Sequence, residues 1–365
     1  MERISATYLL SSTAADVGSR AQALALEQSV EMPLAAVRDA RIREEIVARV
    51  AGIDAAEDGR FRVTLEIAVE TVGDNPAQLL NMLFGNCSLQ DDVVLEDALL
   101  PETMVAAFRG PRFGIAGVRD ITGVHGRALT CTALKPQGSS PETLAELCET
   151  FAEAGIDVIK DDHGIADQRY APFEERVQRC QAAVMRASAR TGKKVRYAPS
   201  LVGTPRRVAE AARIARDCGV RIVLVAPMLM GLPAFTEFAA EAHDLAILAH
   251  PAFGGLRMSP AFLFGKLFRL MGADAVIYPN YGGRFAYSAG VCRALAQALR
   301  APLGSVAPAL PVPAGGMPVE RTAEMVGFYG KDAMLLIGGS LLAAGDALLD
   351  RSRSFVAAVE EAGAR

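Results

Sequence analysis

The sequence has 365 residues, of which 51% are hydrophobic, and a formal net charge of -4 at pH 7. This length suggests two domains or one large barrel with an appendage, and the charge argues against a nucleic-acid binder. Six scattered cysteines without a Cys-x-x-Cys pair are typical of buried thiols in a reducing compartment, not of zinc sites or disulfides. Residues 1–10 are too short and polar for a signal peptide, and no apolar stretch is long enough to span a membrane. We therefore expect a cytoplasmic protein that binds neither nucleic acid nor membrane.

The first part of the chain, residues 1–126, shows no regular repeat of elements. Strands are predicted at 3–10, 49–55, 60–70 and 92–99, with helices at 16–26 and 76–83. Proline and glycine residues between 101 and 114 mark the exit from this region. We predict an α+β N-terminal domain over residues 1–126, built on an antiparallel sheet.

From residue 127 the pattern becomes a regular alternation of short apolar runs and helices. The apolar runs lie at 128–134, 157–162, 195–201, 221–227, 245–250, 274–279, 310–314 and 333–337. Eight strand-helix units over residues 127–365 fit a (β/α)8 TIM barrel. The alternative is a doubly wound open sheet, which would normally open with a glycine-rich turn over a dinucleotide. The first turn here is instead Lys-Pro-Gln-Gly-Ser-Ser, which favours the barrel. The predicted fold class is therefore α/β, with the barrel following the α+β domain.

Polar residues follow several of the predicted strands, where barrel enzymes carry their chemistry. Lys135 follows the first strand, the run Lys160-Asp161-Asp162-His163 ends the second, and His250 follows the fifth. Because side chains alternate along a strand, Lys160 and Asp162 should share one face and Asp161 should point the other way. A solvated strand end or a helix cap would also explain this run taken alone. Its position among the other strand ends favours a catalytic site.

Two glycine pairs end the seventh and eighth strands, Gly315-Gly316 and Gly338-Gly339. Loops at these two positions of a barrel commonly bind a phosphate through backbone N–H groups, and glycine allows the close approach. Glycine also forms turns, so one pair alone would carry little weight. The two pairs together predict a phosphate site.

The barrel, with these motifs, resembles the Rubisco superfamily over nearly the whole chain. Thr132-Ala133-Leu134-Lys135-Pro136 resembles the motif of the first strand with its active-site lysine. Lys160-Asp161-Asp162 resembles the metal motif, which implies a carbamate on Lys160 formed from CO₂, with Mg²⁺ bound by that carbamate and Asp162. His163 stands where the family has a glutamate ligand. It is expected either to bind the metal, with Mn²⁺ as an alternative to Mg²⁺, or to act as a base; loss of the metal is the third alternative.

The same resemblance assigns the remaining site residues. His250 resembles the active-site histidine, and the two glycine pairs match the phosphate-binding glycines. Glu27 and Asn86 resemble residues that the N-terminal domain contributes to a neighbouring subunit's site, which implies a homodimer with shared active sites.

Several departures from the family pattern argue against CO₂ fixation. The second lysine of the first motif is Gln137, the arginine after the strand-five histidine is Pro251, and the serine before the strand-seven glycines is Ala314. The loop after the sixth strand, Asn280 to Arg284, lacks the lysine of true carboxylases. The chain is similar instead to the Rubisco-like proteins, which keep enolisation chemistry without carboxylation.

The expected activity is metal-assisted enolisation of a sugar monophosphate, with proton transfer by Lys135 or by the Lys160 carbamate. The chain has no lysine before residue 135, whereas the methionine-salvage enolases of the family place their base lysine in the N-terminal domain. The enolase reaction is therefore disfavoured. We favour isomerisation of 5-methylthioribulose 1-phosphate in sulfur salvage, because Tyr281 and Phe285 are expected to line a thioether pocket. The alternatives are a decarboxylase of a 3-oxo branched sugar-acid phosphate and a non-catalytic barrel that serves as a sensor or assembly partner.

Overall fold

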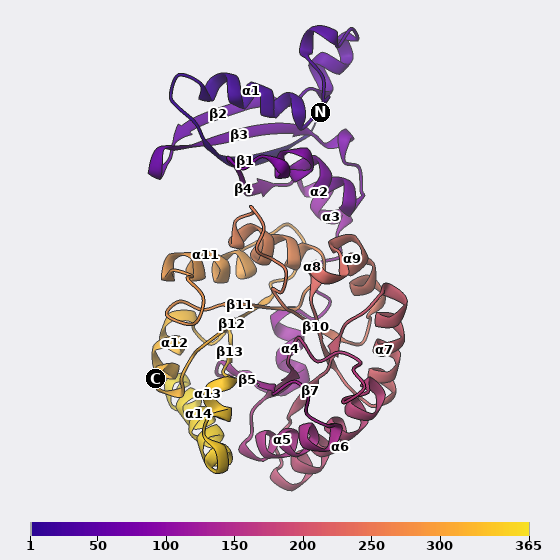
Figure 1. The fold of residues 1–365 in the computed structure, drawn as a ribbon, viewed down its shortest axis with the longest axis vertical. Coiled ribbons are helices and arrows are strands. Elements are labelled where there is room, and N and C mark those ends of the chain that lie inside the picture. Colours follow the sequence, from indigo (N-terminus) through magenta and orange to yellow (C-terminus); the bar gives the residue numbers. More distant parts are fainter. Residues whose placement is uncertain (1, 365) are drawn as a thin grey trace. The chain divides into compact units, whose positions relative to one another are not determined.

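The computed structural model describes residues 2–364 and divides into two compact units (Figure 1). The first unit takes in the chain up to Phe108 together with Gly254–Leu263 and Leu303–Val306. The second unit contains Arg109–Phe253, Phe264–Pro302 and the chain from Ala307 onward. Within residues 2–364, no helix is long and apolar enough to cross a membrane.

The first unit is an α+β unit with an antiparallel sheet, as predicted. The sheet has four strands in the order β2-β3-β1-β4. Its strands are β1 (Arg3–Ser11), β2 (Arg49–Ala55), β3 (Arg60–Ala68) and β4 (Val93–Leu99). Its helices are α1 (Val17–Glu27), α2 (Pro76–Phe84) and α3 (Glu102–Ala107), with short turns η1 (Leu34–Ala36), η2 (Ile42–Ile46), η3 (Glu57–Gly59), η4 (Val69–Thr71) and η5 (Asn86–Leu89). Alternate side chains of β1, from Ile4 to Leu10, are fully buried, so one face of the sheet forms the core of the unit.

The outer edge of β4 is closed by a later part of the chain. The Leu95 N–H donates to the Arg257 carbonyl at 3.0 Å, and the Ser259 N–H donates to the Leu95 carbonyl at 2.9 Å. The edge strand is thereby paired, which protects backbone groups that would otherwise be open to another chain.

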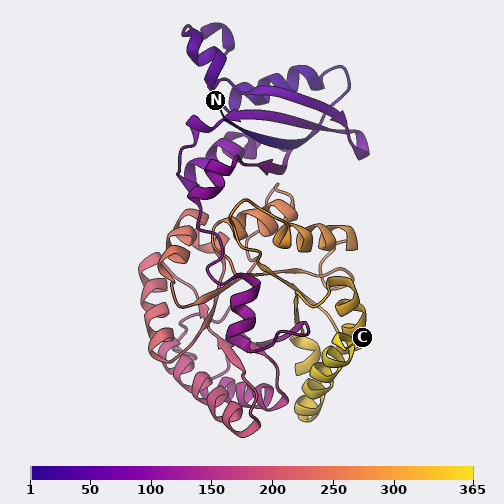
Figure 2. The same ribbon diagram turned by 180° about the vertical axis from the view of Figure 1, so that it is seen from behind.

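The second unit alternates parallel strands with helices that form a ring around them (Figures 1 and 2). Its strands are β5 (Leu129–Leu134), β6 (Val158–Asp161), β7 (Arg196–Ala198), β8 (Ser200–Leu201), β9 (Ile222–Val225), β10 (Ala246–Ala249), β11 (Ala275–Pro279), β12 (Leu310–Ala314) and β13 (Met334–Leu336). Its main helices are α5 (Pro141–Ala154), α6 (Phe173–Thr191), α7 (Pro205–Asp217), α8 (Pro227–Met230), α9 (Leu232–Glu241), α10 (Phe268–Leu270), α11 (Ala289–Arg300), α12 (Thr322–Tyr329), α13 (Gly339–Leu342) and α14 (Leu348–Gly363). The short turns η7 (Val319–Arg321) and η8 (Gly345–Ala347) precede α12 and α14, and the π-helical turn η6 (Ala261–Leu267) leads into α10.

The strands form two hydrogen-bonded parallel sheets in the orders β12-β11-β10-β9-β8 and β13-β5-β6-β7. Strands β7 and β8 are two pieces of the third barrel strand, separated by Pro199, which has no N–H to donate. The sheets contact each other at both seams, β12 against β13 and β7 against β9. This arrangement confirms the α/β fold class with a C-terminal (β/α)8 barrel.

An additional helix, α4 (Gly114–Thr122), lies inside the ring of helices in front of the strands in Figure 2. Its Val118 and Ile121 pack into the same core as the inward side chains of the strands. The buried carboxylate of Asp274, just before β11, accepts hydrogen bonds from the N–H groups of Phe113 (2.6 Å) and Gly114 (2.8 Å) at the start of α4. Because α4 packs with the barrel, the compact units divide at residues 108 and 109, whereas the sequence placed the division at 126 and 127.

Candidate active site

Four of the predicted site residues meet at the carboxyl ends of β5, β6 and β10. The Lys135 ammonium lies 2.7 Å from Oδ1 of Asp162, and His163 Nδ1 lies 3.5 Å from the same oxygen. The His163 ring stacks on the His250 ring with centroids 4.2 Å apart and an interplanar angle of 11°. The structure thus brings together Lys135, Asp162, His163 and His250, which lie far apart in the sequence.

Lys160 is the buried lysine of this cluster, with only 2% of its surface exposed. Its ammonium donates to the Asp161 carbonyl at 2.8 Å. Burial lowers the pKa of Lys160, and the nearby charge of Lys135 lowers it further, against the opposing effect of the carboxylates of Asp161 and Asp162. A lysine in such a place gives up its proton more readily, and the neutral amine is its nucleophilic form.

Asp162 carries the negative charge of the cluster. Burial alone would raise the pKa of Asp162, but hydrogen bonds from His163 and Lys135, with the charge of Lys160, lower that pKa well below its usual range. The carboxylate therefore stays ionised throughout the neutral range and is available to hold a cation or to orient Lys135.

His250 is held as a neutral imidazole. Its Nδ1 accepts the Ala252 N–H at 3.1 Å, which places the ring proton on Nε2. Burial, followed by the charges of Lys160 and His163, lowers the pKa of His250 to about 2. His250 can therefore donate a hydrogen bond from Nε2 to a substrate oxygen, and it does not act as a cationic acid at neutral pH.

Asp161 points to the other side of β6, as the alternation of side chains predicts. Its carboxylate accepts hydrogen bonds from Arg176, Tyr197 and the Ser200 N–H, on the side away from Lys135 and Asp162. These partners come from α6, β7 and β8, and the sequence alone does not identify them.

The first glycine pair has a structural use of its own. Gly315 and Gly316 have φ angles of 93° and 89°, which favour glycine, and the Arg284 N–H donates to the Gly315 carbonyl at 2.9 Å. A Cβ on Gly283 would lie 2.0 Å from that carbonyl oxygen, so the loop after β11 crosses this pair at backbone contact. The crossing also brings the exposed Arg284 against Gly316, a neighbour that sequence reasoning did not place there.

The second glycine pair, Gly338 and Gly339, opens the four-residue helix α13. Gly339 has no neighbouring atom within 4 Å of a Cβ position, and the nearest to Gly338 is the Ala133 side chain at 3.7 Å. Packing therefore does not require glycine here as it does at Gly315 and Gly316. Phosphate binding by the two pairs stays a prediction.

The two aromatic residues expected near a thioether have different surroundings. The Tyr281 ring packs on Phe328 of α12 (centroids 4.8 Å apart), and its hydroxyl donates to Glu324 at 2.7 Å. Phe285 keeps half of its surface exposed, and its ring lies 3.2 Å from the Cβ position of Gly315. Phe285 is therefore the one of the two that lies beside the glycines, and the Arg284 guanidinium lies over its ring at 5.4 Å from the centroid.

The two predicted residues of the first unit contact each other. Asn86 donates from Nδ2 to Glu27 at 2.9 Å and to Glu31 at 2.9 Å, so one amide joins two carboxylates. Glu31, which the sequence analysis missed, has a positive φ of 52°. In the sequence, its position four residues after Glu27 was the feature that could have indicated a shared contact with Asn86. A contribution of this group to a neighbouring subunit stays a prediction.

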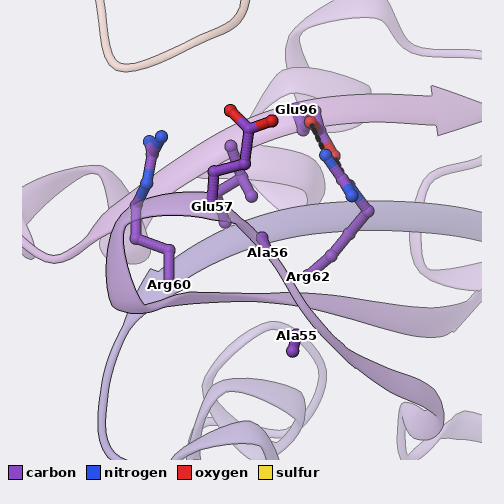
Figure 3. A pocket seen from close by; sticks show the side chains of 7 residues that line it. Ala55, Ala56, Glu57, Arg60, Arg62 and Glu96 are labelled. Atoms are coloured by element: carbon purple, nitrogen blue, oxygen red, sulfur yellow. Dashed lines mark hydrogen bonds and ion pairs between the residues drawn. The ribbon is translucent and has the colours of Figure 1, made fainter.

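A cavity of about 530 Å³ lies elsewhere in the first unit (Figure 3). It is lined by Leu9, Ala55, Ala56, Glu57, Arg60, Arg62 and Glu96, so it contains none of the predicted site residues. Arg62 and Glu96 form an ion pair in its wall, with the Arg60 guanidinium apart from them in Figure 3. Small-molecule sites are mostly apolar, whereas this cavity is lined largely by charged residues. The cluster around Asp162 is therefore the better candidate for the substrate site.

Comparison with known proteins identifies the family. The sequence model of one protein family, the ribulose bisphosphate carboxylase large chain, catalytic domain, matches residues 114–347. The chain belongs to this Rubisco large-chain family.

The chain is 50% identical over 363 residues to ribulose bisphosphate carboxylase-like protein 1 of Rhodopseudomonas palustris, covering 99% of each chain. It is 47% identical over 366 residues to the 5-methylthioribulose-1-phosphate isomerase of Rhodospirillum rubrum, covering 100% of this chain and 98% of that one. The crystal structure of a Rubisco-like protein from Rhodopseudomonas palustris matches with a TM-score of 0.93 and 45% identity, covering 100% and 99% of the two chains. The resemblance to Rubisco-like proteins is thereby confirmed.

The metal site that membership of the Rubisco family implies can be tested against these residues. Within residues 2–364, no group of three or more His, Cys, Asp and Glu side chains is placed to hold a metal. The predicted set contains only two such residues, Asp162 and His163, and its third member is the carbamate on Lys160. The ionised Asp162 and a carbamate would supply the oxygen ligands that Mg²⁺ prefers, and His163 would supply a nitrogen that suits Mn²⁺. The donor set therefore fits a divalent cation once Lys160 is carbamylated.

Proposed function

We propose that this chain isomerises 5-methylthioribulose 1-phosphate by proton transfer next to its carbonyl group, without fixing CO₂. The observation that carries the proposal is the cluster at the ends of β5, β6 and β10, where Lys135 contacts Asp162 beside the buried Lys160. The substrate follows from the whole-length identity of 47% to the isomerase of Rhodospirillum rubrum. The absence of any lysine before residue 135 supports the isomerase over the enolase.

Each residue of the cluster has a separate role in proton transfer. Lys135 is the acid or base that moves the proton, and its ion pair with Asp162 holds its ammonium in place. His250, neutral and with its proton on Nε2, donates to the oxygen that becomes negative on enolisation. A divalent cation held by carbamylated Lys160, Asp162 and His163 would stabilise the same negative charge as a Lewis acid.

The remaining predicted residues bind the substrate. Gly315, Gly316, Gly338 and Gly339 are proposed to hold its single phosphate through their backbone N–H groups. Glu27 and Asn86 are proposed to reach the site of a second subunit in a cytoplasmic homodimer. The decarboxylase of a 3-oxo branched sugar-acid phosphate and the non-catalytic barrel remain the alternatives for the same cluster.

The test is proton exchange followed by NMR in D₂O. The purified chain is incubated with 5-methylthioribulose 1-phosphate, bicarbonate and Mg²⁺ or Mn²⁺, and deuterium at the carbons beside the carbonyl and the isomeric product are measured. We expect exchange and product with the natural chain and neither with Lys160→Ala or Asp162→Ala. Lys331→Ala, which removes an exposed lysine, is the control. Exchange that survives both site substitutions would refute the assigned roles, and no exchange with any sugar phosphate would favour the non-catalytic barrel.

A further inference from the structure

We propose that Asp161 is a positioning residue for this reaction, a buried carboxylate that fixes the end of β6 and with it Lys160 and Asp162. The inference rests on the proposed function only in taking Lys160 and Asp162 as groups that act on the substrate. Asp161 itself has no exposed surface and cannot touch a substrate.

The Asp161 carboxylate joins three other elements of the barrel. Its Oδ1 accepts the Tyr197 hydroxyl of β7 at 2.7 Å. Its Oδ2 accepts the Ser200 N–H of β8 at 3.0 Å and Nε of Arg176 from α6 at 3.1 Å. Three donors from three elements therefore converge on one side chain.

The Asp161 carboxylate replaces backbone pairing at the point where the ladder between β6 and the third barrel strand ends. Strand β6 pairs with β7 up to Lys160, which lies opposite Ala198. The next residue, Pro199, faces the other neighbouring strand, since its carbonyl accepts the Leu224 N–H of β9 at 2.9 Å. The following N–H, that of Ser200, goes to the Asp161 side chain instead. Asp161 thus holds β6 to the third barrel strand where backbone pairing stops.

The two neighbours of Asp161 in the sequence are the groups it positions. Lys160 donates from Nζ to the Asp161 backbone carbonyl at 2.8 Å, so the lysine head group is held by the same residue. Asp162 follows directly and lies 2.7 Å from Lys135. A shift of the Asp161 backbone would move both contacts together.

Stability alone does not account for the buried charges. Asp161 and Arg176 have no exposed surface, and the guanidinium further donates to the Ala171 carbonyl at 2.6 Å. Arg176 Nη2, however, has no hydrogen-bond partner within residues 2–364. A buried ion pair commonly contributes no more stability than apolar side chains of the same size, because both charges lose their water. We infer that the buried pair serves instead to fix the position of the end of β6.

The same strand carries a matched control at its other end. Asp157, immediately before β6, is also buried and pairs with Arg127 through two contacts, at 2.7 and 3.0 Å. It also accepts the Thr130 N–H at 2.7 Å. Asp157 repeats the chemistry of Asp161, but it lies at the end of β6 that carries no predicted site residue.

The experiment compares Asp161→Ala with Asp157→Ala in kcat, KM and Tm, measured well below both unfolding transitions. Because small displacements of reacting groups are costly, we expect Asp161→Ala to lower kcat by about tenfold or more while KM changes by less than about threefold. Asp157→Ala should lower Tm and leave kcat within about twofold. Asp161→Asn, which keeps the shape of the side chain, should restore most of kcat. Equal kcat in Asp161→Ala and Asp157→Ala would overturn the proposal.

Two further measurements keep the test decisive. If Asp161→Ala does not fold, Tyr197→Phe removes one of the three donors and should still lower kcat, and an unchanged kcat would count against the positioning role. If the natural chain does not turn over 5-methylthioribulose 1-phosphate, the proposed function fails by itself. Crystal structures of the natural chain and Tyr197→Phe then decide: the proposal expects a change in the Lys135–Asp162 or Lys160–Asp161 contact, and identical contacts would refute it.

Discussion

Asp274 should make the stability of the barrel decrease as the pH rises from about 4 to about 6. Its carboxylate is buried and accepts N–H groups from Phe113, Gly114 and Ile247, the last at 2.8 Å. Burial raises the pKa of Asp274 to about 6, and the three N–H donors offset only part of that increase. The folded chain therefore keeps a proton on Asp274 over a range in which the unfolded chain has lost it.

The size of the effect follows from the two pKa values of Asp274. An aspartate in an unfolded chain has a pKa of about 3.9, roughly two units below the folded value. Between these values the folded state binds one proton more than the unfolded state, so the free energy of unfolding falls with rising pH by about 1.4 kcal/mol per unit. The loss from pH 4 to above pH 6 is about 3 kcal/mol, a large fraction of the stability of a typical domain.

The assay is urea unfolding of the natural chain and Asp274→Asn at several pH values between about 4 and 7. Asparagine cannot ionise, so the difference in the free energy of unfolding between the two chains isolates Asp274. We expect the natural chain to lose about 3 kcal/mol relative to Asp274→Asn across this range. Asp346→Asn, at an exposed carboxylate, is the control and should follow the natural chain. A difference that stays constant with pH would refute the reasoning.

Three further predictions concern the active site. Lys135→Ala should lower kcat by about 100-fold or more, as expected for loss of a general acid or base, and a smaller loss in the exchange assay would assign proton transfer elsewhere. Removal of divalent cations with EDTA should abolish exchange and Mg²⁺ or Mn²⁺ should restore it; full activity in EDTA would exclude the metal role. Gly283→Ala should raise KM, because its Cβ would lie 2.0 Å from the Gly315 carbonyl oxygen and displace the loop, and an unchanged KM would show that this crossing does not shape the phosphate site.

The alternation of apolar runs and helices was enough to predict the barrel, because strand and helix periods differ and each unit is local. The same local reasoning placed Asp161 opposite to Lys160 and Asp162. It did not reveal the break of the third strand at Pro199, since residues 195–201 read as one apolar run. It also missed α4 as part of the barrel, because the packing of Val118 and Ile121 depends on strands far along the chain.

The candidate active site was also predictable from the sequence only in part. The types and positions of Lys135, Lys160, Asp162 and His250 pointed to one cluster, because the carboxyl ends of barrel strands share one face. Their charge states needed the structure. The neutral form of His250 depends on its burial and on the Ala252 N–H, and the ionisation of Asp162 depends on His163 and Lys135. The crossing of the β11 loop over Gly315 also depends on three-dimensional packing.

The discontinuity of the first unit has a consequence for synthesis of the chain on the ribosome. Residues up to Phe108 emerge first, but the segment that closes the edge of β4, through Arg257 and Ser259, is translated only after most of the barrel. Until then the nascent sheet carries an open strand edge, a known starting point for aggregation. A fragment ending near residue 108 should therefore be less soluble than the full chain, and a linker that supplies residues 254–263 to it should improve its solubility.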